Sequence, residues 1–310
     1  YNNARGKPEK KKFISRMRGY HGVTIASGSL TGLPMVHTDF DLPIKNVLHT
    51  TCPHFYRGGQ EGETEEQFTD RMAKDLDDLI QREGPETIAA FIAEPIMGAG
   101  GVVVPPMSYF PKINAVLEKY DVRFIADEVI CGFGRTGNWF GTQTFGMKAT
   151  SISMAKAITS AYFPMSAITI EEDLYQAMVD ESKKIGTFGH VFTYTAQPVG
   201  CAVALKTIEI YQRDRIVEHV RKVAPVFKAR LDKLAEHPLV GEARGVGLIG
   251  ALELVADKKT RRAFDPKKMV GATCVNFLQA LGLINRAMGD SVAFCPPLII
   301  TEQEINEMFE

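Results

Sequence analysis

Short apolar segments alternate with amphipathic helical patterns along much of the chain, and this alternation limits the possible folds more than any other feature. Residues 87–93 (TIAAFIA), 122–126 (VRFIA) and 150–154 (TSISM) are typical of buried strands. Residues 65–82 and 109–120 place apolar side chains at helical spacing. Strands separated by helices favour an α/β fold in which helices sandwich a mostly parallel central sheet.

The pattern changes in the last third of the chain. A helical pattern covers residues 196–236, with a break near Asp214. Beyond it, residues 244–255 predict a strand, residues 269–281 a helix, and short strands follow around 283–285 and 292–294. We therefore expect a large domain in residues 1–215 and a smaller C-terminal α+β domain in residues 216–310.

Composition argues against several classes of function. The 310 residues carry a formal net charge of −1, which gives no electrostatic basis for binding nucleic acid or an anionic membrane. The basic run at residues 7–12 is short and is interpreted as a solvated loop. The seven histidines lack metal-ligand spacing, so no zinc site is expected. Five dispersed cysteines without a Cys-x-x-Cys pair predict reduced thiols and a cytoplasmic location.

Both ends of the chain look cut. The sequence opens at Tyr1 without a methionine, in a polar segment. It stops at Glu310, inside a helical pattern for which Thr301 is a suitable N-cap. We expect a fragment of a longer protein.

Asp127 directly follows one of the predicted strands. In parallel sheets, ligands bind beyond the carboxyl ends of the strands, where the pair Asp127 and Glu128 would lie. A carboxylate there can bind a metal, act as a base, or pair with a protonated ring nitrogen. Alternatively, the pair is a strand-end cap that bonds to its own loop.

Lys156 is the only charged residue between Lys148 and Glu171. Apolar surroundings would disfavour its charged form and lower its pKa, which makes the amine a better nucleophile for a carbonyl. The alternative is an ordinary lysine whose charged end reaches water.

Two glycine-rich segments are further candidates. In residues 19–22 (GYHG), glycines flank an aromatic pair, which suits either a loop beside a flat ligand or a turn with a buried tyrosine. Residues 132–137 (GFGRTG) resemble a glycine-rich phosphate-binding loop. No helical pattern follows them, however, which argues against a dinucleotide or Walker-type site.

In this order and spacing, the segments resemble the class III (omega) aminotransferases, which are fold-type I pyridoxal-phosphate enzymes. The resemblance covers nearly the whole chain and is closest to amine or omega-amino acid–pyruvate aminotransferases. The matching stretches are residues 19–22, 93–96 (AEPI), 127–129 (DEV), 132–137, Lys156 before 159–160, 192–194 (FTY) with Pro198, 244–247 (RGVG) and 296–298 (PPL).

The resemblance implies the roles of the catalytic pair and of the residues around the cofactor ring. Lys156 would bind pyridoxal phosphate covalently and move a proton, and Asp127 would keep the pyridine nitrogen protonated. Tyr20, which would also contact substrate, and Val129 would lie against opposite faces of the ring. His21 and Glu94 would be close to the cofactor.

Two more residues concern the partner subunit and the substrate. Thr193 would bond the cofactor phosphate of the partner subunit, which implies a homodimer. Arg286 would bind the carboxylate of the amino acceptor, although it could instead be an ordinary surface arginine. Ala99 stands where the ornithine and γ-aminobutyrate branches carry an acid that pairs with an arginine, which favours amine or omega-amino-acid donors with pyruvate as acceptor.

The implied reaction is a ping-pong transamination from an amine or omega-amino acid to pyruvate or a similar 2-oxo acid. An aminomutase or racemase would use the same residues, and a catalytically inactive fragment is the third reading. In relatives, the Gly-Ser-x-x-Asn phosphate loop precedes the GYHG segment, and it is missing from this chain. We therefore expect weak or absent cofactor in the chain as it stands.

Overall fold

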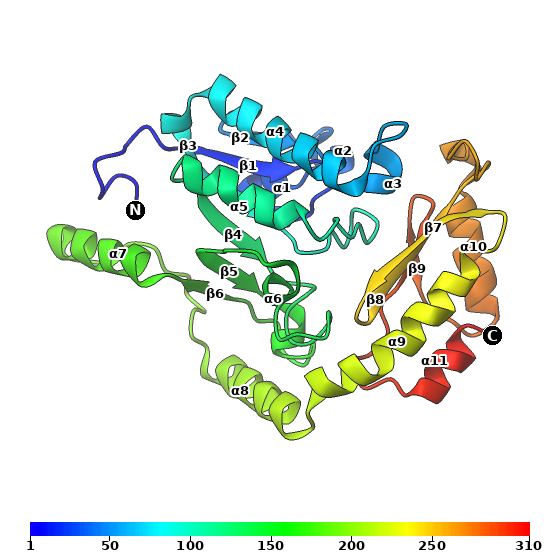
Figure 1. Ribbon diagram of the computed structural model, residues 1–310. Helices are drawn as coiled ribbons and strands as arrows, with labels where there is room; N and C mark the ends of the chain where they lie inside the picture. The colour runs from blue at the N-terminus through cyan, green and yellow to red at the C-terminus, as the bar shows by residue number, and fades with distance from the viewer.

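Two β-sheets organise the chain. The computed structural model describes residues 1–310, and its larger sheet has six strands in the order β2-β1-β3-β4-β5-β6 (Figure 1). Neighbours from β2 through β5 run parallel, whereas the edge strand β6 is antiparallel to β5. The strands are β1 (Lys12–Arg16), β2 (Val47–Thr50), β3 (Ile88–Ala93), β4 (Arg123–Asp127), β5 (Ser151–Met154) and β6 (Ala167–Ile170). The expected mostly parallel central sheet is confirmed.

The strands predicted from sequence are those with the most continuous apolar runs. All residues of β3 are buried, because this strand lies inside the sheet and is covered on both faces. Strands β1, β2 and β6 were not predicted from the sequence. Strand β1 has a basic residue at each end. Strand β6 lies at the sheet edge, where two of its residues are exposed, so buried and exposed residues do not alternate along it.

Helices pack against this sheet and connect its strands. Two of the predicted helices are α4 (Glu65–Glu83) and α5 (Tyr109–Lys119), which pack together along the sheet in Figure 1. Thr64 begins α4 with a capping box, and the apolar stripe of α4 is buried in the main core. The others in this part are α1 (Ile25–Leu30), α2 (Pro34–His37), α3 (Phe55–Gly58), α6 (Gly141–Phe145), α7 (Glu172–Ile185) and the 3₁₀ turns η1 (Pro85–Thr87) and η2 (Lys156–Ile158).

The smaller sheet is antiparallel and has the order β7-β8-β10-β9. Its strands are β7 (Val240–Val246), β8 (Ile249–Leu254), β9 (Arg286–Met288) and β10 (Ser291–Phe294). Its helices are η3 (Pro266–Lys268), α10 (Val270–Ala280) and α11 (Glu302–Met308), and Thr301 caps the last of these as expected. The predicted α+β character of this part is therefore present.

Two strand predictions in this region were wrong. Residues 244–255 form two strands of a hairpin rather than one strand, because Gly247 turns the chain at φ +62°. A Cβ at Gly247 would approach the backbone oxygen of Arg135 to 2.3 Å, so a side chain does not fit there. The strand expected at residues 283–285 begins only at Arg286.

The long helical pattern is two helices, α8 (Pro198–Arg213) and α9 (Ile216–Leu234). The predicted break near Asp214 is confirmed, because Arg215 adopts φ +50° between them. Helix α9 packs on β7 and β8 of the smaller sheet. A division of domains at residue 215 stays a prediction.

A buried arginine joins the two sheets. Arg244 on β7 donates from Nε to the carbonyl oxygen of Val102 at 2.9 Å, and its Nη2 also bonds to the carbonyl of Gly101, in the loop that follows β3. The same guanidinium pairs with Glu253 at 2.9 Å and Glu242 at 2.6 Å. Here "the Arg244 joint" means this guanidinium with its two carboxylates and two carbonyls.

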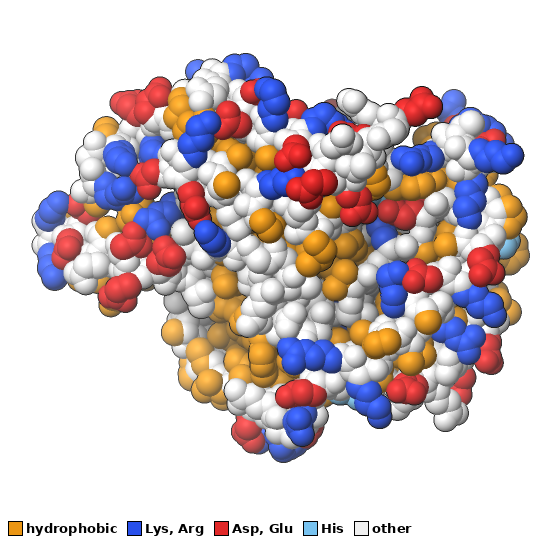
Figure 2. Space-filling model, in the orientation of Figure 1, with side chains coloured by type: hydrophobic (Ala, Val, Ile, Leu, Met, Phe, Trp, Pro, Cys, Tyr) orange, Lys and Arg blue, Asp and Glu red, His pale blue; other side chains and the backbone are white.

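The basic run at residues 7–12 was expected to be solvated, but this is wrong for Lys10. Its side chain is buried, and its Nζ donates to the carbonyl oxygens of Ile88, Tyr120 and Asp121 at 3.1, 3.0 and 2.8 Å. Burial lowers the pKa of Lys10. Elsewhere, Figure 2 shows basic and acidic side chains interspersed over the viewed face rather than gathered by sign.

Candidate functional site

Asp127 ends β4 at the carboxyl edge of the parallel strands. Both of its carboxylate oxygens are engaged: Oδ1 accepts the backbone N–H of Val129 at 3.1 Å, and Oδ2 lies 2.8 Å from Nδ1 of His21. The side chain is 9% exposed, so a narrow edge of the carboxylate remains accessible. The orientation of this acid is thus set within the chain.

His21 lies beside Asp127 and comes from the loop between β1 and α1. Its side chain is 2% exposed, and its backbone N–H donates to Oγ1 of Thr31 at 2.9 Å. The expected place of His21 next to the cofactor stays a prediction. In the structure its ring is bonded to Asp127, and its Nε2 is buried without a hydrogen-bond partner.

Glu94 follows β3 and fixes the loop that carries Tyr20. Its Oε1 accepts the backbone N–H of Tyr20 and its Oε2 that of Gly98, both at 2.9 Å. Burial raises the pKa of this carboxyl, and the nearby charge of Asp127 raises it further, while His21 opposes both. Tyr20 itself is half-buried. Glu94 therefore links the Tyr20 loop to the end of β3.

Glu128 has a structural task. This side chain is fully buried and accepts the backbone N–H groups of Gly141 at 2.9 Å and Thr142 at 2.6 Å, at the start of α6. For Glu128, the alternative reading as a cap is therefore correct, although the loop it bonds lies further along the chain. Asp127 alone faces the site.

Lys156 begins η2, just beyond β5, which is the parallel neighbour of β4. The register pairs Asp127 with Ser153, so Lys156 follows at the same sheet edge as Asp127. Its backbone is strained, with φ +46°, a conformation that clusters at functional sites. The side chain is exposed in the single chain. The expectation that apolar neighbours enclose it was wrong for the single chain, because its side chain is exposed although Ile158 and Thr159 nearby are buried.

The glycine-rich segment 132–137 joins the two sheets rather than forming a phosphate cradle opening a helix. Gly134 and Gly137 adopt positive φ, and Arg135 between them donates to the carbonyl oxygens of Leu248 at 2.9 Å and Pro296 at 2.6 Å. This arrangement explains the segment as a turn that docks against the smaller sheet.

Thr193 and Arg286 lie apart from these residues. Thr193 is exposed in the segment between α7 and α8, and α7 itself has no buried residue and projects from the body in Figure 1. Arg286 is exposed at the start of β9, the edge strand of the smaller sheet. The single chain does not bring either residue into contact with Asp127.

The sequence analysis missed Arg16, the last residue of β1. It is buried, its Nη2 donates to the carbonyl oxygen of Glu94, and its guanidinium lies 5.6 Å from the ring centre of Phe110. Arg16 thereby fixes the backbone of Glu94, the residue that directly follows β3. The only signal was that a charged residue ends a short segment containing Phe13 and Ile14.

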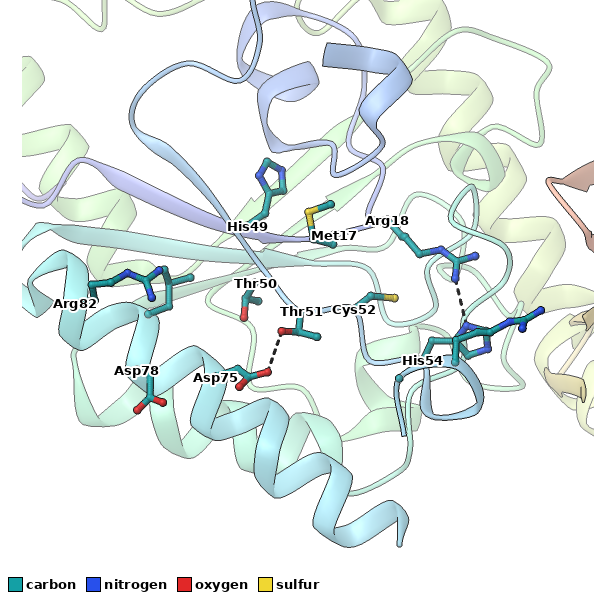
Figure 3. Close-up of a pocket in the computed structure, with 13 residues that line it drawn as sticks. Met17, Arg18, His49, Thr50, Thr51, Cys52, His54, Asp75, Asp78 and Arg82 are labelled. Carbon is teal, nitrogen blue, oxygen red and sulfur yellow. Dashed lines mark hydrogen bonds between the residues drawn. The ribbon is translucent and has the colours of Figure 1, made fainter. Parts of the chain in front are cut away.

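A hollow of about 680 Å³ lies elsewhere, beyond the ends of β1 and β2 (Figure 3). Arg18 points toward His54 with a nitrogen–nitrogen distance of 3.3 Å, and Thr51 donates to Asp75 at 2.9 Å. None of the predicted site residues lines it. Because the residues of the candidate site lie outside this hollow, we do not assign the chemistry to it.

The Asp127 site fits the pyridine end of pyridoxal phosphate. Each oxygen of Asp127 accepts one protein hydrogen bond, and an ionised carboxylate oxygen has room for another. The ring nitrogen would face this carboxylate, and Lys156 on the neighbouring strand end would meet the aldehyde. No group of His, Cys, Asp and Glu side chains is arranged to hold a metal ion. No helix combines the length and apolar character needed to cross a bilayer.

Comparison with known proteins identifies the family. All residues, 1–310, match the family described as Aminotransferase class-III. Gamma aminobutyrate transaminase 1, mitochondrial, of Solanum lycopersicum is 49% identical over 308 residues, which are 99% of this chain and 60% of that protein. The rice (Oryza sativa subsp. japonica) gamma-aminobutyrate transaminase 1, also mitochondrial, gives the same 49% identity, 99% and 60% coverage.

Solved structures agree with this. A structure described as a transaminase with L-ala is 56% identical, has a TM-score of 0.98, and matches 99% of this chain and 73% of its own. The omega transaminase of Pseudomonas jessenii in complex with PMP is 50% identical with a TM-score of 0.97, covering 99% of this chain and 69% of that one. The chain spans 60% of the length of the curated relatives named above. By sequence and by structure, it belongs to the class III aminotransferase family.

Proposed function

We propose that the protein is a pyridoxal-phosphate-dependent aminotransferase that moves an amino group from an amine or omega-amino acid to pyruvate or a similar 2-oxo acid, by a ping-pong mechanism. The observation that carries the proposal is the position of Asp127 and Lys156. Asp127 is buried at the end of β4 and accepts a hydrogen bond on each carboxylate oxygen, and Lys156 lies just beyond the end of the neighbouring strand β5. Family membership supports the reaction class.

The residues divide the work in the proposed mechanism. Bound pyridoxal phosphate supplies an electron sink. Asp127 would face the ring nitrogen with its negative charge and keep it protonated. Lys156 would hold the cofactor through its amine and would move the proton to and from the substrate carbon. Tyr20 and Val129 would lie on the two sides of the ring, and Tyr20 would also border the substrate.

Donor and acceptor follow from two positions. Arg286 binds the acceptor carboxylate through its planar guanidinium, and its exposure leaves it free to move aside for donors without a carboxylate. Ala99 offers no acid to hold such an arginine in place. The names of the relatives, gamma aminobutyrate transaminase and omega transaminase, are consistent with an omega-amino-acid donor.

The proposed active unit is a homodimer. Thr193 lies on an exposed segment, residues 186–196, where Phe192 is 77% and Tyr194 85% exposed. Exposed aromatic side chains of this kind suit a protein interface. In the dimer, Thr193 would bind the phosphate of the partner's cofactor. We also propose a cytoplasmic location on the basis of five free cysteines, although the tomato and rice relatives are named mitochondrial.

The test is a half-reaction on the complete natural protein that contains this chain. The protein is loaded with pyridoxal phosphate and mixed with one donor from a panel of amines and omega-amino acids, without acceptor. Absorbance reports transfer of the amino group to the cofactor, and released ketone or aldehyde is quantified. We expect one carbonyl product per site, and pyruvate then restores the starting absorbance while yielding alanine.

Two results would contradict the proposal. Racemised or isomerised donor without release of a carbonyl compound would indicate the alternative, a racemase or aminomutase. No spectral change with any donor, in protein that binds the cofactor, would indicate a catalytically inactive member of the family.

A further inference from the structure

We propose that Tyr211 is a positioning residue for Lys156: its hydroxyl, near the end of α8, anchors the backbone turn from which the lysine side chain extends. The inference rests on the proposed function, because it gives a task to a contact beside the proposed catalytic amine. Oη of Tyr211 donates to the carbonyl oxygen of Ala157, the residue directly after Lys156, at 2.9 Å. Tyr211 therefore acts through the backbone and not on the substrate.

The turn at residues 156–161, here called the lysine turn, has an unfavourable backbone. Lys156, Ser160 and Ala161 adopt φ angles of +46°, +49° and +64°. None of the three is glycine, and a positive φ brings the Cβ of an L-residue too close to the backbone. Such conformations persist only where the surrounding structure holds them. The lysine turn therefore needs anchors that lie outside it.

The structure supplies an anchor at each end of the lysine turn. At its far end, the buried Thr159 donates from Oγ1 to the carbonyl oxygen of Phe163 at 2.6 Å. At its start, next to Lys156, the carbonyl of Ala157 accepts the Tyr211 hydroxyl. The second bond is the one hydrogen bond that joins α8 to this turn. It is thus the anchor closest to the lysine.

Helix α8 brings Tyr211 to this position with its buried face. The buried residues of the helix recur at helical spacing and are Gly200, Ala204, Thr207 and Tyr211. This face packs on η2, and Tyr211 belongs to the same apolar cluster as Ile158 of the lysine turn. The ring of Tyr211 also lies beside that of Phe133, with 6.3 Å between the ring centres. The packed ring leaves the hydroxyl little freedom to leave Ala157.

The hydroxyl of Tyr211 can be separated from the packing of its ring. A phenylalanine would fill the same apolar space, so the hydroxyl contributes only its hydrogen bond to Ala157. Tyr56 offers the opposite case, because its hydroxyl is buried without a hydrogen-bond partner. Removing the hydroxyl of Tyr56 breaks no hydrogen bond, which makes this tyrosine a matched control.

The experiment compares Tyr211→Phe and the control Tyr56→Phe in the complete natural protein that contains this chain. Hydrogen exchange of the cofactor-free protein is followed by mass spectrometry over residues 156–162, with β4 (Arg123–Asp127) as an internal reference. The other measurements are kcat and KM for a donor in the protein loaded with pyridoxal phosphate, and the melting temperature without cofactor.

We expect Tyr211→Phe to accelerate exchange in residues 156–162 by about 2- to 10-fold, the factor that corresponds to one net hydrogen bond. Exchange in β4 should not change. The value of kcat should fall by about 3- to 10-fold, because a displaced amine is less often in reach of the reacting carbon. KM for the donor should stay within about 2-fold, since the lost contact does not bind substrate. Tyr56→Phe should match the wild type in exchange, kcat and KM.

Three results would overturn the inference alone. The first is wild-type exchange of residues 156–162 in Tyr211→Phe, and the second is faster exchange there with wild-type kcat, which would leave Tyr211 a purely structural role. The third is an equal loss of kcat in Tyr56→Phe. A wild-type protein that fails to bind pyridoxal phosphate would instead overturn the proposed function, and with it the task of Tyr211, whatever the exchange of the cofactor-free protein shows.

Discussion

The two halves of the candidate site are built differently. The side chains of Asp127, His21 and Glu94 are buried, and each makes hydrogen bonds that this one chain supplies. Lys156, Thr193 and Arg286 are exposed and lie on three separate segments. The first half is therefore organised before anything binds, whereas the surroundings of the second half depend on the molecules that bind there. This contrast predicts that mutations in the exposed half lower catalysis alone, whereas mutations in the buried half also lower the stability of the fold.

The largest expected effect is that of Lys156→Ala. In the proposed reaction it removes the group that holds the cofactor and moves the proton, so turnover should fall by at least about 100-fold. The melting temperature of the cofactor-free protein should barely change, because substitutions of exposed residues usually alter stability by no more than about 0.5 kcal/mol. Steady-state kinetics and thermal unfolding measure the two effects.

Asp127→Ala is the matched variant from the buried half. It should reduce turnover as well, but it also leaves the Val129 N–H and the His21 ring without a partner, at a cost of about 1–3 kcal/mol per group. Equal melting temperatures for the two variants would break the distinction between the halves.

Arg286→Ala should have an intermediate effect, confined to the acceptor. A charge-assisted hydrogen bond to a carboxylate contributes about 1.5–3 kcal/mol, which corresponds to an increase in KM for pyruvate of about 10-fold or more. KM for an amine without a carboxylate should be unchanged. Initial rates at varied pyruvate and varied amine test this, and an equal rise in both KM values would contradict the assignment.

The smallest expected effect is a change in how stability depends on pH, caused by Glu94. Its pKa in the folded state is raised from 4.5, chiefly by burial. In the pH range between 4.5 and this raised pKa, the folded protein therefore binds more protons than the unfolded chain. The contribution of Glu94 to stability is thus full below pH 4.5 and is lost as pH rises through its folded pKa. Denaturant unfolding across this range should show a flatter profile for Glu94→Gln. An identical slope in both proteins would mean that Glu94 does not titrate in this way.

The sequence predicted the fold where burial leaves a continuous local pattern. Strands β3, β4 and β5 were found because they lie inside the sheet and their residues are buried or half-buried. Strand β6 was not, because an edge strand with exposed Ile168 has no such pattern. The hairpin β7–β8 was read as one strand because the turn at Gly247 interrupts an apolar run by its backbone conformation alone.

The candidate site was predictable only in part, for a related reason. Asp127 and Lys156 could be placed at strand ends because each follows its strand in the sequence. The contact between His21 and Asp127 joins residues 106 positions apart, so no local pattern reports it. The exposure of Lys156 was also missed, because apolar residues that are neighbours in sequence need not surround a side chain in space.

The Arg244 joint has a mechanical consequence for the smaller sheet. Moving this sheet away from the larger one would strip a buried guanidinium of the carbonyls of Gly101 and Val102, and it would also break the bonds from Arg135 to Leu248 and Pro296. The joint is on β7, and Arg286 is on β9 at the opposite edge, three strand spacings or roughly 14 Å away. With the connections at Arg244, Leu248 and Pro296, Arg286 lies on the strand that none of these bonds holds to the larger sheet.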